Sequence, residues 1–170
     1  MAEPFNSKSL SGAKAERYAE LALEIAAVLD GEDNPVARLA SVTAMLSQSF
    51  ETFFWTGFYL VDPQRPEELV VGPYQGTLGC LRIAFGKGVC GTAAAERRTQ
   101  IVPDVHAFPG HIPCDDKSRS EIVVPVFGKG GRLLGVLDVD STELAAFDET
   151  DAAGLEQILA HAFSEATTLP

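Results

Sequence analysis

The residues best suited to chemistry are the three cysteines of the sequence, Cys80, Cys90 and Cys114. Cys114 lies in a long polar segment, where packing does not require a thiol. An odd number of cysteines excludes a fully paired disulfide framework, and the sequence has no Cys-x-x-Cys motif of the kind that zinc ribbons and thioredoxin-type dithiols use. A thiol in a polar loop, with two more thiols within folding reach, indicates redox chemistry.

Two of these thiols occupy different local contexts. Cys80 follows the glycine-containing segment 76–79, which is flexible enough to let it approach another thiol. We expect Cys80 to start a strand. Cys90 opens the alanine-rich stretch 93–96, and a thiol at a helix N-terminus has a lowered pKa. The other interpretation of Cys90, as a small buried apolar residue, stays open.

Carboxylates form a second group with chemical potential. In the predicted strand 133–140, alternation directs Leu137 and Val139 to the core and places Asp138 and Asp140 on the opposite face, about 7 Å apart. Glu121 begins a neighbouring predicted strand. If these acids are desolvated, one keeps its proton near neutral pH. They could bind a ligand ammonium or donate a hydrogen bond to a ligand oxygen; solvated strand-end acids and a hard-metal site are the alternatives.

Aromatic residues share a face of another predicted strand, 53–61. Alternation directs Trp55, Gly57 and Tyr59 to one side, which would suit a cage for a small ligand. Partial burial under a loop is the equally open alternative. The opposite, core-facing side carries Phe54, Phe58 and Leu60.

A zinc site is the remaining option for the loop between strands. His106 and His111 could bind a metal together with Cys90 and Cys114. Their spacing matches no zinc motif that coordination chemistry explains. We therefore expect neither a metal nor a cofactor.

The elements that position these residues are helices, then strands, then a helix. An Ala/Leu/Glu-rich helix is predicted at 13–29, a second helix starts at Asn34-Pro35, and Asp148 caps a final helix with an apolar stripe. A turn at 129–131 joins the last two strands. The strands are predicted at 53–61, 68–74, 80–84, 99–102, 121–127 and 133–140. The sequence therefore predicts an α+β fold with one antiparallel sheet and helices packed on one face.

Composition sets limits on function. The chain has 170 residues, a length typical of one domain, and a net charge of −11, which argues against nucleic acid and anionic membranes as partners. The first residues carry no signal-peptide pattern, and no apolar run approaches the roughly 20 residues that span a bilayer. We expect a cytoplasmic protein, in which a disulfide is more often catalytic than structural.

Five motifs together resemble the free methionine-(R)-sulfoxide reductases, which are stand-alone GAF-domain enzymes. The motifs are Trp55-Thr-Gly-Phe-Tyr-Leu60, Phe85-Gly-Lys-Gly-Val-Cys-Gly-Thr-Ala93, Val102-Pro-Asp-Val-His-Ala-Phe-Pro-Gly-His-Ile-Pro-Cys114, Ser118-Arg-Ser-Glu-Ile-Val-Val-Pro125 and Gly135-Val-Leu-Asp-Val-Asp-Ser141. The resemblance runs from about Trp55 to the C-terminal helix. It implies a single GAF domain over 1–170, with N-terminal helices in 1–50, the sheet and active-site loops in 53–140, the C-terminal helix in 147–166, and a ligand pocket on the sheet face opposite the helices.

The resemblance also implies roles for the cysteines. The residue matching Cys114 attacks the sulfoxide sulfur and becomes a sulfenic acid, and the residue matching Cys80 resolves it to a disulfide that thioredoxin reduces. The residue matching Cys90 is a pocket thiol that assists or substitutes. Trp55, Tyr59, Glu121, Asp138 and Asp140 are the expected substrate-binding residues. We also expect a homodimer formed through the N-terminal helices, as in many GAF domains.

A non-catalytic GAF domain that binds a small molecule or senses oxidants is the alternative function. Such a domain would form its disulfide stoichiometrically and show no turnover.

Overall fold

The computed structural model describes residues 12–170 of the chain. Residues 1–11 of the predicted N-terminal helical region lie outside the described residues. In chain order, the elements are α1 (Lys14–Leu29), α2 (Pro35–Ser49), β1 (Trp55–Asp62), β2 (Arg65–Gln75), β3 (Arg82–Ala84), α3 (Gly88–Glu96), β4 (Gln100–Val102), the 3-10 turn η2 (Val105–Ala107), β5 (Ser120–Phe127), the 3-10 turn η3 (Lys129–Gly131), β6 (Leu133–Ser141) and α4 (Glu149–Phe163).

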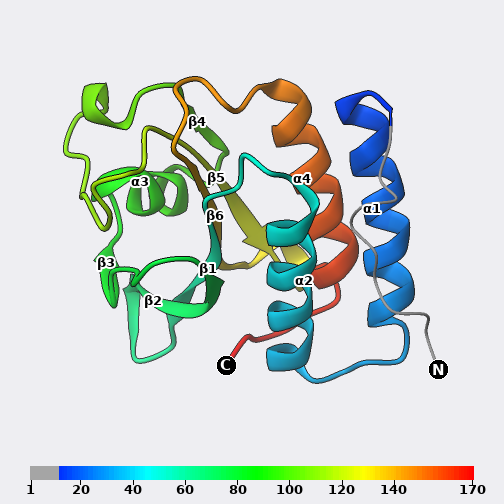
Figure 1. Ribbon diagram of the computed structural model, residues 1–170. Helices are drawn as coiled ribbons and strands as arrows, with labels where there is room; N and C mark the ends of the chain where they lie inside the picture. The colour runs from blue at the N-terminus through cyan, green and yellow to red at the C-terminus, as the bar shows by residue number, and fades with distance from the viewer. Residues whose placement is uncertain (1–11) are drawn as a thin grey trace.

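The strands form one antiparallel sheet with the order β3-β2-β1-β6-β5-β4. Figure 1 shows α1, α2 and α4 on one side of this sheet and α3 on the other, next to the segments that connect β3, β4 and β5. The predicted α+β architecture, with N- and C-terminal helices on one face, is confirmed.

Side chains that accept hydrogen bonds from backbone N–H groups cap the N-termini of α2 and α4. The Asn34 side chain accepts hydrogen bonds from the backbone N–H groups of Val36 and Ala37, and Pro35 occupies the first turn of α2. At α4, the Asp148 side chain accepts from two backbone N–H groups, and Asp151 completes a capping box. Both predicted helix starts are confirmed.

Helix α1 is held against α4 by polar and apolar contacts. The Tyr18 hydroxyl donates to Asp151 Oδ1 at 2.9 Å, and Lys14 Nζ lies 2.8 Å from Asp151 and 2.9 Å from Asp148. Gly154 permits this approach, because a Cβ there would lie 2.3 Å from the Tyr18 ring. The predicted apolar stripe of α4 is buried in the same layer; it comprises Leu155, Ile158, Leu159, Ala162 and Phe163.

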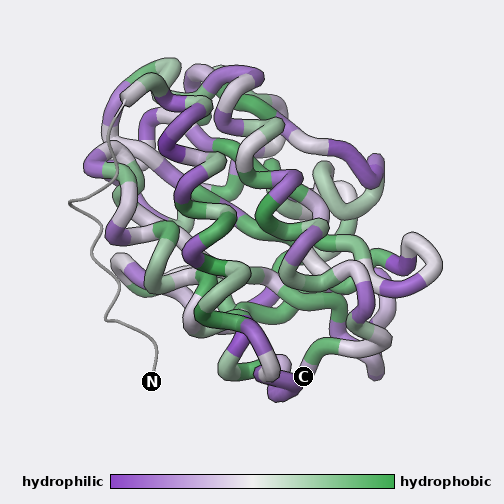
Figure 2. The backbone as a smooth tube through the Cα atoms, turned by 90° about the vertical axis from the view of Figure 1, so that its right-hand side faces the viewer, coloured by the Kyte–Doolittle hydropathy of each residue, from purple (hydrophilic) through white to green (hydrophobic). Residues whose placement is uncertain are grey.

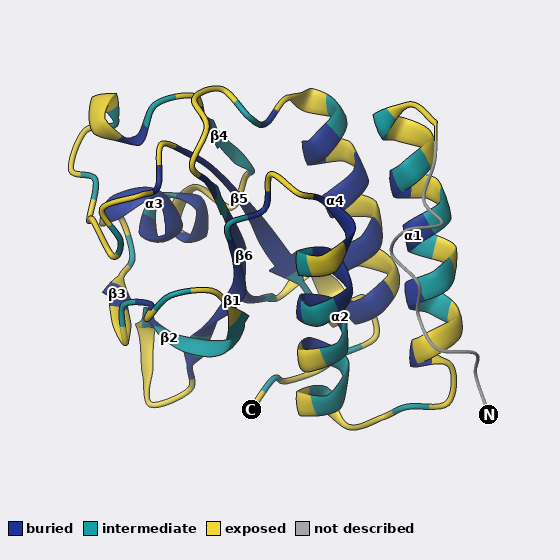
Figure 3. Cartoon of the chain, in the orientation of Figure 1, coloured by how far each residue is buried: buried dark blue, intermediate teal, exposed yellow. Residues whose placement is uncertain are grey.

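The core consists of two apolar clusters, one on each face of the sheet. Phe58 and Leu60 pack with the helices, whereas Trp55 and Tyr59 belong to the cluster beside α3. The alternation predicted for this strand is therefore confirmed within β1. Figure 3 shows the buried strands at the centre, and Figure 2 shows hydrophobic and hydrophilic residues alternating along the helices.

Two predictions at strand ends are wrong. Phe54 packs with the cluster of Trp55 rather than that of Phe58, because β1 begins only at Trp55 and the bend before it does not follow strand alternation. Cys80 does not start a strand: β3 begins at Arg82, and Cys80 lies in the irregular segment before it. No helix within 12–170 is long and apolar enough to cross a membrane.

Candidate functional site

Strand register brings the predicted acids and aromatic residues to one face of the sheet. Asp140 pairs with Trp55 on one side and with Glu121 on the other, and Asp138 pairs with Gly57. Since β6 lies between β1 and β5, side chains of all three strands converge beside α3.

Trp55 and Tyr59 form an aromatic wall of this site. The Trp55 ring stacks with Tyr59 at 5.8 Å and with Tyr74 at 5.1 Å between centroids. Gly57 makes room for the indole, because a Cβ there would lie 2.7 Å from it. Trp55 and Tyr59 are both buried, and both line a pocket. Their position therefore fits both interpretations of the sequence, a cage for a small ligand and burial of the aromatic rings.

The three carboxyl groups lie at the base of the pocket. Glu121 and Asp138 are each only 6% exposed, and Asp140 is partly buried. Burial raises the pKa of Asp138 to about 7 and raises the pKa values of Glu121 and Asp140 well above the ordinary range, with a further contribution from the charge of Asp138. The alternative of solvated strand-end acids is therefore wrong.

One oxygen of this cluster has no hydrogen-bond donor. Asp138 Oδ1 is buried without a hydrogen-bond partner in the structure. An unpaired buried carboxylate oxygen is costly, and a ligand that supplies a donor removes that cost. The pocket is therefore suited to a ligand with a cationic or hydrogen-bond-donating group.

Cys90 lies in the first turn of α3, and its thiol points toward the acids. Its Sγ is 4.0 Å from Glu121 Oε1. Burial, followed by the charges of Asp138 and Glu121, raises the pKa of Cys90 well above its ordinary value. The expectation that the helix N-terminus lowers this pKa is wrong, because desolvation and two nearby acids outweigh the helix dipole. The alternative interpretation, a buried residue, describes its position.

Cys80 and Cys114 form a disulfide at the pocket. Their Cα atoms are 5.5 Å apart, although 34 positions separate them in the sequence. Cys114 is exposed and Cys80 is half-buried. The bond joins the segment before β3 to the long segment before β5.

Hydrogen bonds that the sequence did not reveal fix these two segments to each other and to β1. The Thr77 hydroxyl donates to Asp115 Oδ2 at 2.5 Å, and Trp55 Nε1 donates to the Thr77 carbonyl at 2.9 Å. The Tyr59 hydroxyl lies against Gly79 of the same segment, where a Cβ would lie 3.0 Å from it. Thr77 and Asp115 stand 38 positions apart in irregular segments, so no periodic pattern could pair them.

The histidines of the long segment lie close to each other, and one of the four residues considered for a zinc site is used by the disulfide. His106 and His111 have ring centroids 6.2 Å apart, and Cys114 is bonded to Cys80. Within the described part of the chain, the group with potential ligand atoms within 4.8 Å of one another is Cys90, Glu121 and Asp138.

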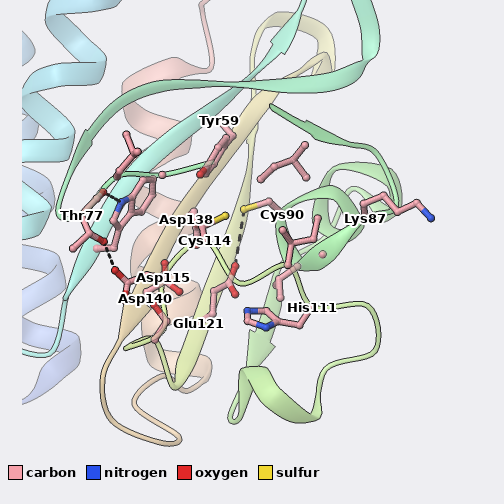
Figure 4. A pocket seen from close by; sticks show the side chains of 18 residues that line it. Tyr59, Thr77, Lys87, Cys90, His111, Cys114, Asp115, Glu121, Asp138 and Asp140 are labelled. Carbon is pink, nitrogen blue, oxygen red and sulfur yellow. Dashed lines mark hydrogen bonds between the residues drawn. The ribbon is translucent and has the colours of Figure 1, made fainter. Parts of the chain in front are cut away.

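The resulting pocket has a volume of about 530 Å³ including its open mouth (Figure 4). In Figure 4 the acids and Cys90 point toward one another, and dashed lines mark the Cys90–Glu121 and Thr77–Asp115 contacts. The site residues predicted from the sequence that line it are Trp55, Tyr59, Cys90, Cys114, Glu121, Asp138 and Asp140. Residues that the sequence did not single out also line it, including Thr77, Leu78, Ile83, Lys87, Ile112, Asp115 and Ser118.

Known proteins resemble the chain over most of its length. The model of the GAF domain matches residues 39–163. GAF domain-containing protein A of Dictyostelium discoideum is 53% identical over 87% of this chain and 91% of its own, and the free methionine-R-sulfoxide reductase of Escherichia coli is 44% identical over 86% and 87%. The solved structure of free methionine-R-sulfoxide reductase from Neisseria meningitidis with its substrate superimposes with a TM-score of 0.85, at 49% identity over 89% of each chain.

These similarities cover the sheet, the pocket and both cysteine-bearing segments. The chain therefore belongs to the GAF-domain family of free methionine-R-sulfoxide reductases.

Proposed function

We propose that this protein reduces free L-methionine (R)-S-oxide to L-methionine through a cysteine sulfenic acid and an intramolecular disulfide. The observation that carries the proposal is the Cys80–Cys114 disulfide at a pocket lined by two buried acids and one partly buried acid. Relatives named for the same reaction are 40% and 44% identical to the chain.

The first step is an attack of the Cys114 thiolate on the sulfoxide sulfur. A carboxyl group that keeps its proton at neutral pH protonates the departing sulfoxide oxygen, which makes the sulfur a better electrophile. The protonated oxygen leaves as water once the bond between Cys114 Sγ and the substrate sulfur has formed. A water molecule then attacks Cys114 Sγ, methionine leaves with the electron pair of that S–S bond, and Cys114 becomes a sulfenic acid. Glu121 and Asp140, whose pKa values are raised well above the usual range, supply such protons.

The second step forms the disulfide seen in the structure. The Cys80 thiol attacks the sulfenic sulfur of Cys114, and water leaves. Two electrons have then moved from the two thiols to the sulfoxide. A dithiol reductant must return them before the next turnover.

Asp138 is the group that we assign to the substrate ammonium. Its carboxyl group has the least raised pKa of the three, about 7, and one of its oxygens has no donor. A substrate ammonium supplies both the donor and the opposite charge. Trp55 and Tyr59 enclose the methylthio end, and an enclosed amino group leaves no path for a peptide chain.

Cys90 is assigned a supporting role. Its raised pKa makes it a poor nucleophile at neutral pH, and its contact with Glu121 places a thiol beside the acid cluster. We propose that it helps to position Glu121.

Thioredoxin is the reductant that we propose, in a cytoplasmic setting where such dithiols are kept reduced. A homodimer formed through the N-terminal helices stays a prediction, to be checked by light scattering of the purified protein.

The deciding experiment is a thioredoxin-coupled assay that follows NADPH consumption. Free methionine R-sulfoxide is reduced over many turnovers, whereas the S epimer, an N-acetylated form and a peptide-bound form are not. Comparable rates with the N-blocked forms would contradict the enclosed ammonium site. One disulfide per chain without turnover would instead favour the sensor function.

A further inference from the structure

Exposed apolar side chains gather around the redox disulfide. Leu78 and Leu81 lie within two positions of Cys80, and Ile112 lies two positions before Cys114. Their side chains are 76%, 70% and 38% exposed. Large apolar side chains left in water at one place are typical of an interaction surface.

The substrate pocket does not account for this exposure. Leu81 is not among the residues that line the pocket, and Leu78 lines it while remaining largely in solvent. Ile112 packs against the backbone of Gly88 at the start of α3, where a Cβ would lie 3.3 Å from it. The apolar residues therefore surround the pocket mouth and continue outside it.

This surface is held in one arrangement by its surroundings. The disulfide and the Thr77–Asp115 hydrogen bond join its two segments, and the carbonyl of Leu81 accepts a hydrogen bond from Val71 of β2. A preorganised surface loses little conformational entropy when a partner binds.

The disulfide at the centre of this apolar surface determines the chemistry that a partner must supply. Reduction of a disulfide requires a thiolate to approach one sulfur in line with the bond, so the reductant must cover the cysteine that it attacks. Cys90, the remaining thiol of the described chain, is buried and its pKa is raised, which leaves reduction to an external thiol. Cys114 is the exposed partner of the bond and Cys80 the half-buried one.

We propose that Leu78, Leu81 and Ile112, the reductant surface, form the docking site for a dithiol protein of the thioredoxin class. The inference rests on the proposed function. The reductant's thiolate attacks Cys114 Sγ, a mixed disulfide forms, and Cys80 leaves as a thiolate that takes up a proton. The second thiol of the reductant then attacks the mixed disulfide. This releases Cys114 as a thiol and leaves the reductant oxidised.

The test compares a protein reductant with a small one. Leu81→Lys is the main variant, because Leu81 lies outside the pocket. Leu23→Lys is the matched control, since Leu23 is 74% exposed on α1. With thioredoxin, we expect Leu81→Lys to raise the KM for thioredoxin about fivefold or more, the effect of losing an interface contact worth ~1 kcal/mol. Leu23→Lys leaves it unchanged.

Dithiothreitol separates docking from catalysis. With this small reductant, Leu81→Lys and the unaltered protein turn over free methionine R-sulfoxide at the same rate. If thioredoxin kinetics are unchanged in both Leu81→Lys and Leu78→Lys, the surface is wrong even though the reaction stands. If the unaltered protein shows no turnover with either reductant, the proposed function itself fails.

A trapped intermediate tests the attacked sulfur. A thioredoxin whose second cysteine is replaced by serine should accumulate a mixed disulfide with Cys114, in lower yield with Leu81→Lys. An adduct mapped to Cys80 would overturn the assignment of the sulfur. Conversion of a dimer to a monomer by Leu81→Lys would show that a second copy of the chain occupies the surface instead.

Discussion

The acid cluster derives its chemistry from burial. Glu121 and Asp138 lie on adjacent strands in a pocket that excludes most water, and their pKa values rise because the charged forms lose solvation. The same burial raises the pKa of Cys90 beside them. The raised pKa values favour the protonated forms of these acids, which suits a proton donor next to a redox thiol.

Single-turnover experiments on serine variants assign the thiols. Cys114→Ser should release no methionine, because no sulfenic acid can form. Cys80→Ser should release about one equivalent per chain and then stall with thioredoxin, because the sulfenic acid lacks its resolving partner. Cys90→Ser should retain more activity than Cys114→Ser. Methionine yield and free-thiol counting measure these outcomes; a full yield in Cys114→Ser with none in Cys90→Ser would make Cys90 the nucleophile.

Amide variants separate the roles of the acids. Asp138→Asn should raise the KM for the sulfoxide about 30-fold or more, the loss expected when a buried charge pair loses one member. Glu121→Gln or Asp140→Asn, whichever removes the proton donor, should slow methionine release about 100-fold.

The pH profile of the single-turnover rate checks the donor. A carboxyl group with a raised pKa is protonated at neutral pH and loses its proton as the pH rises, so the rate falls on the alkaline side. The variant that lacks the donor should lose this alkaline limb. An unchanged limb in Glu121→Gln, Asp138→Asn and Asp140→Asn alike would rule out the role.

At the scale of elements, strand register positions the site and two irregular segments complete it. The strands β1, β6 and β5 supply the aromatic residues and acids, whereas the cysteines that form the disulfide come from the segments before β3 and β5. Rigid strands fix the pocket, and the cross-linked segments form its mouth.

The Thr77–Asp115 hydrogen bond should keep Cys80 close to Cys114 when the disulfide is open. Thr77→Val should slow disulfide formation more than methionine release, by about fivefold, the effect of a hydrogen bond worth ~1 kcal/mol. Thr77→Ser should restore the rate. Thr99→Val is the matched control, because the Thr99 hydroxyl bonds Glu156 away from the pocket.

Trapping with dimedone measures the lifetime of the sulfenic acid. Thr77→Val should also shift the equilibrium with a dithiol buffer toward the reduced protein, since the hydrogen bond helps hold the two cysteines in bonding position. Equal sulfenic acid lifetimes in Thr77→Val and Thr99→Val would contradict this positioning role.

The sequence predicted those features that depend on local geometry. Alternation along β6 predicted that Asp138 and Asp140 share a face, and alternation along β1 predicted the same for Trp55 and Tyr59. Successive strand residues point to opposite faces, so residues two or four positions apart point to the same one. The pKa of Cys90 was predicted in the wrong direction, because the sequence shows the nearby helix but not the burial. The pairing of Cys80 with Cys114 came from the family resemblance, since contacts between irregular segments leave no periodic signal.

At the scale of the whole molecule, the acid cluster opposes folding at neutral pH. The folded-state pKa of Asp138, about 7, lies above the unfolded value near 4, so the folded chain binds its proton more tightly. Stability is therefore highest below the unfolded pKa and is lost as the pH rises through about 7. The pKa values of Glu121 and Asp140 are also raised by burial, so these groups act in the same direction.

Thermal unfolding of the oxidised, substrate-free protein should show this loss. We expect the Tm to fall as the pH rises from 5 to 8 and Asp138→Asn to raise the Tm at pH 8 by about 5 °C. Asp116→Asn, a change at an exposed acid, is the control. If Asp138→Asn lowers the Tm at pH 8, the cluster does not oppose folding.

The disulfide also changes the covalent connectivity of the chain. Each catalytic cycle converts a linear chain into one that contains a ring of about 34 residues, and then opens the ring again. A ring of this size stabilises the folded state by about 4 kcal/mol through its effect on the unfolded ensemble. We therefore expect proteases to degrade the oxidised form, which contains the disulfide, more slowly than the reduced form. Under the proposed cycle, we expect the lifetime of the protein in a cell to follow the balance between the supply of methionine sulfoxide and the supply of reducing equivalents.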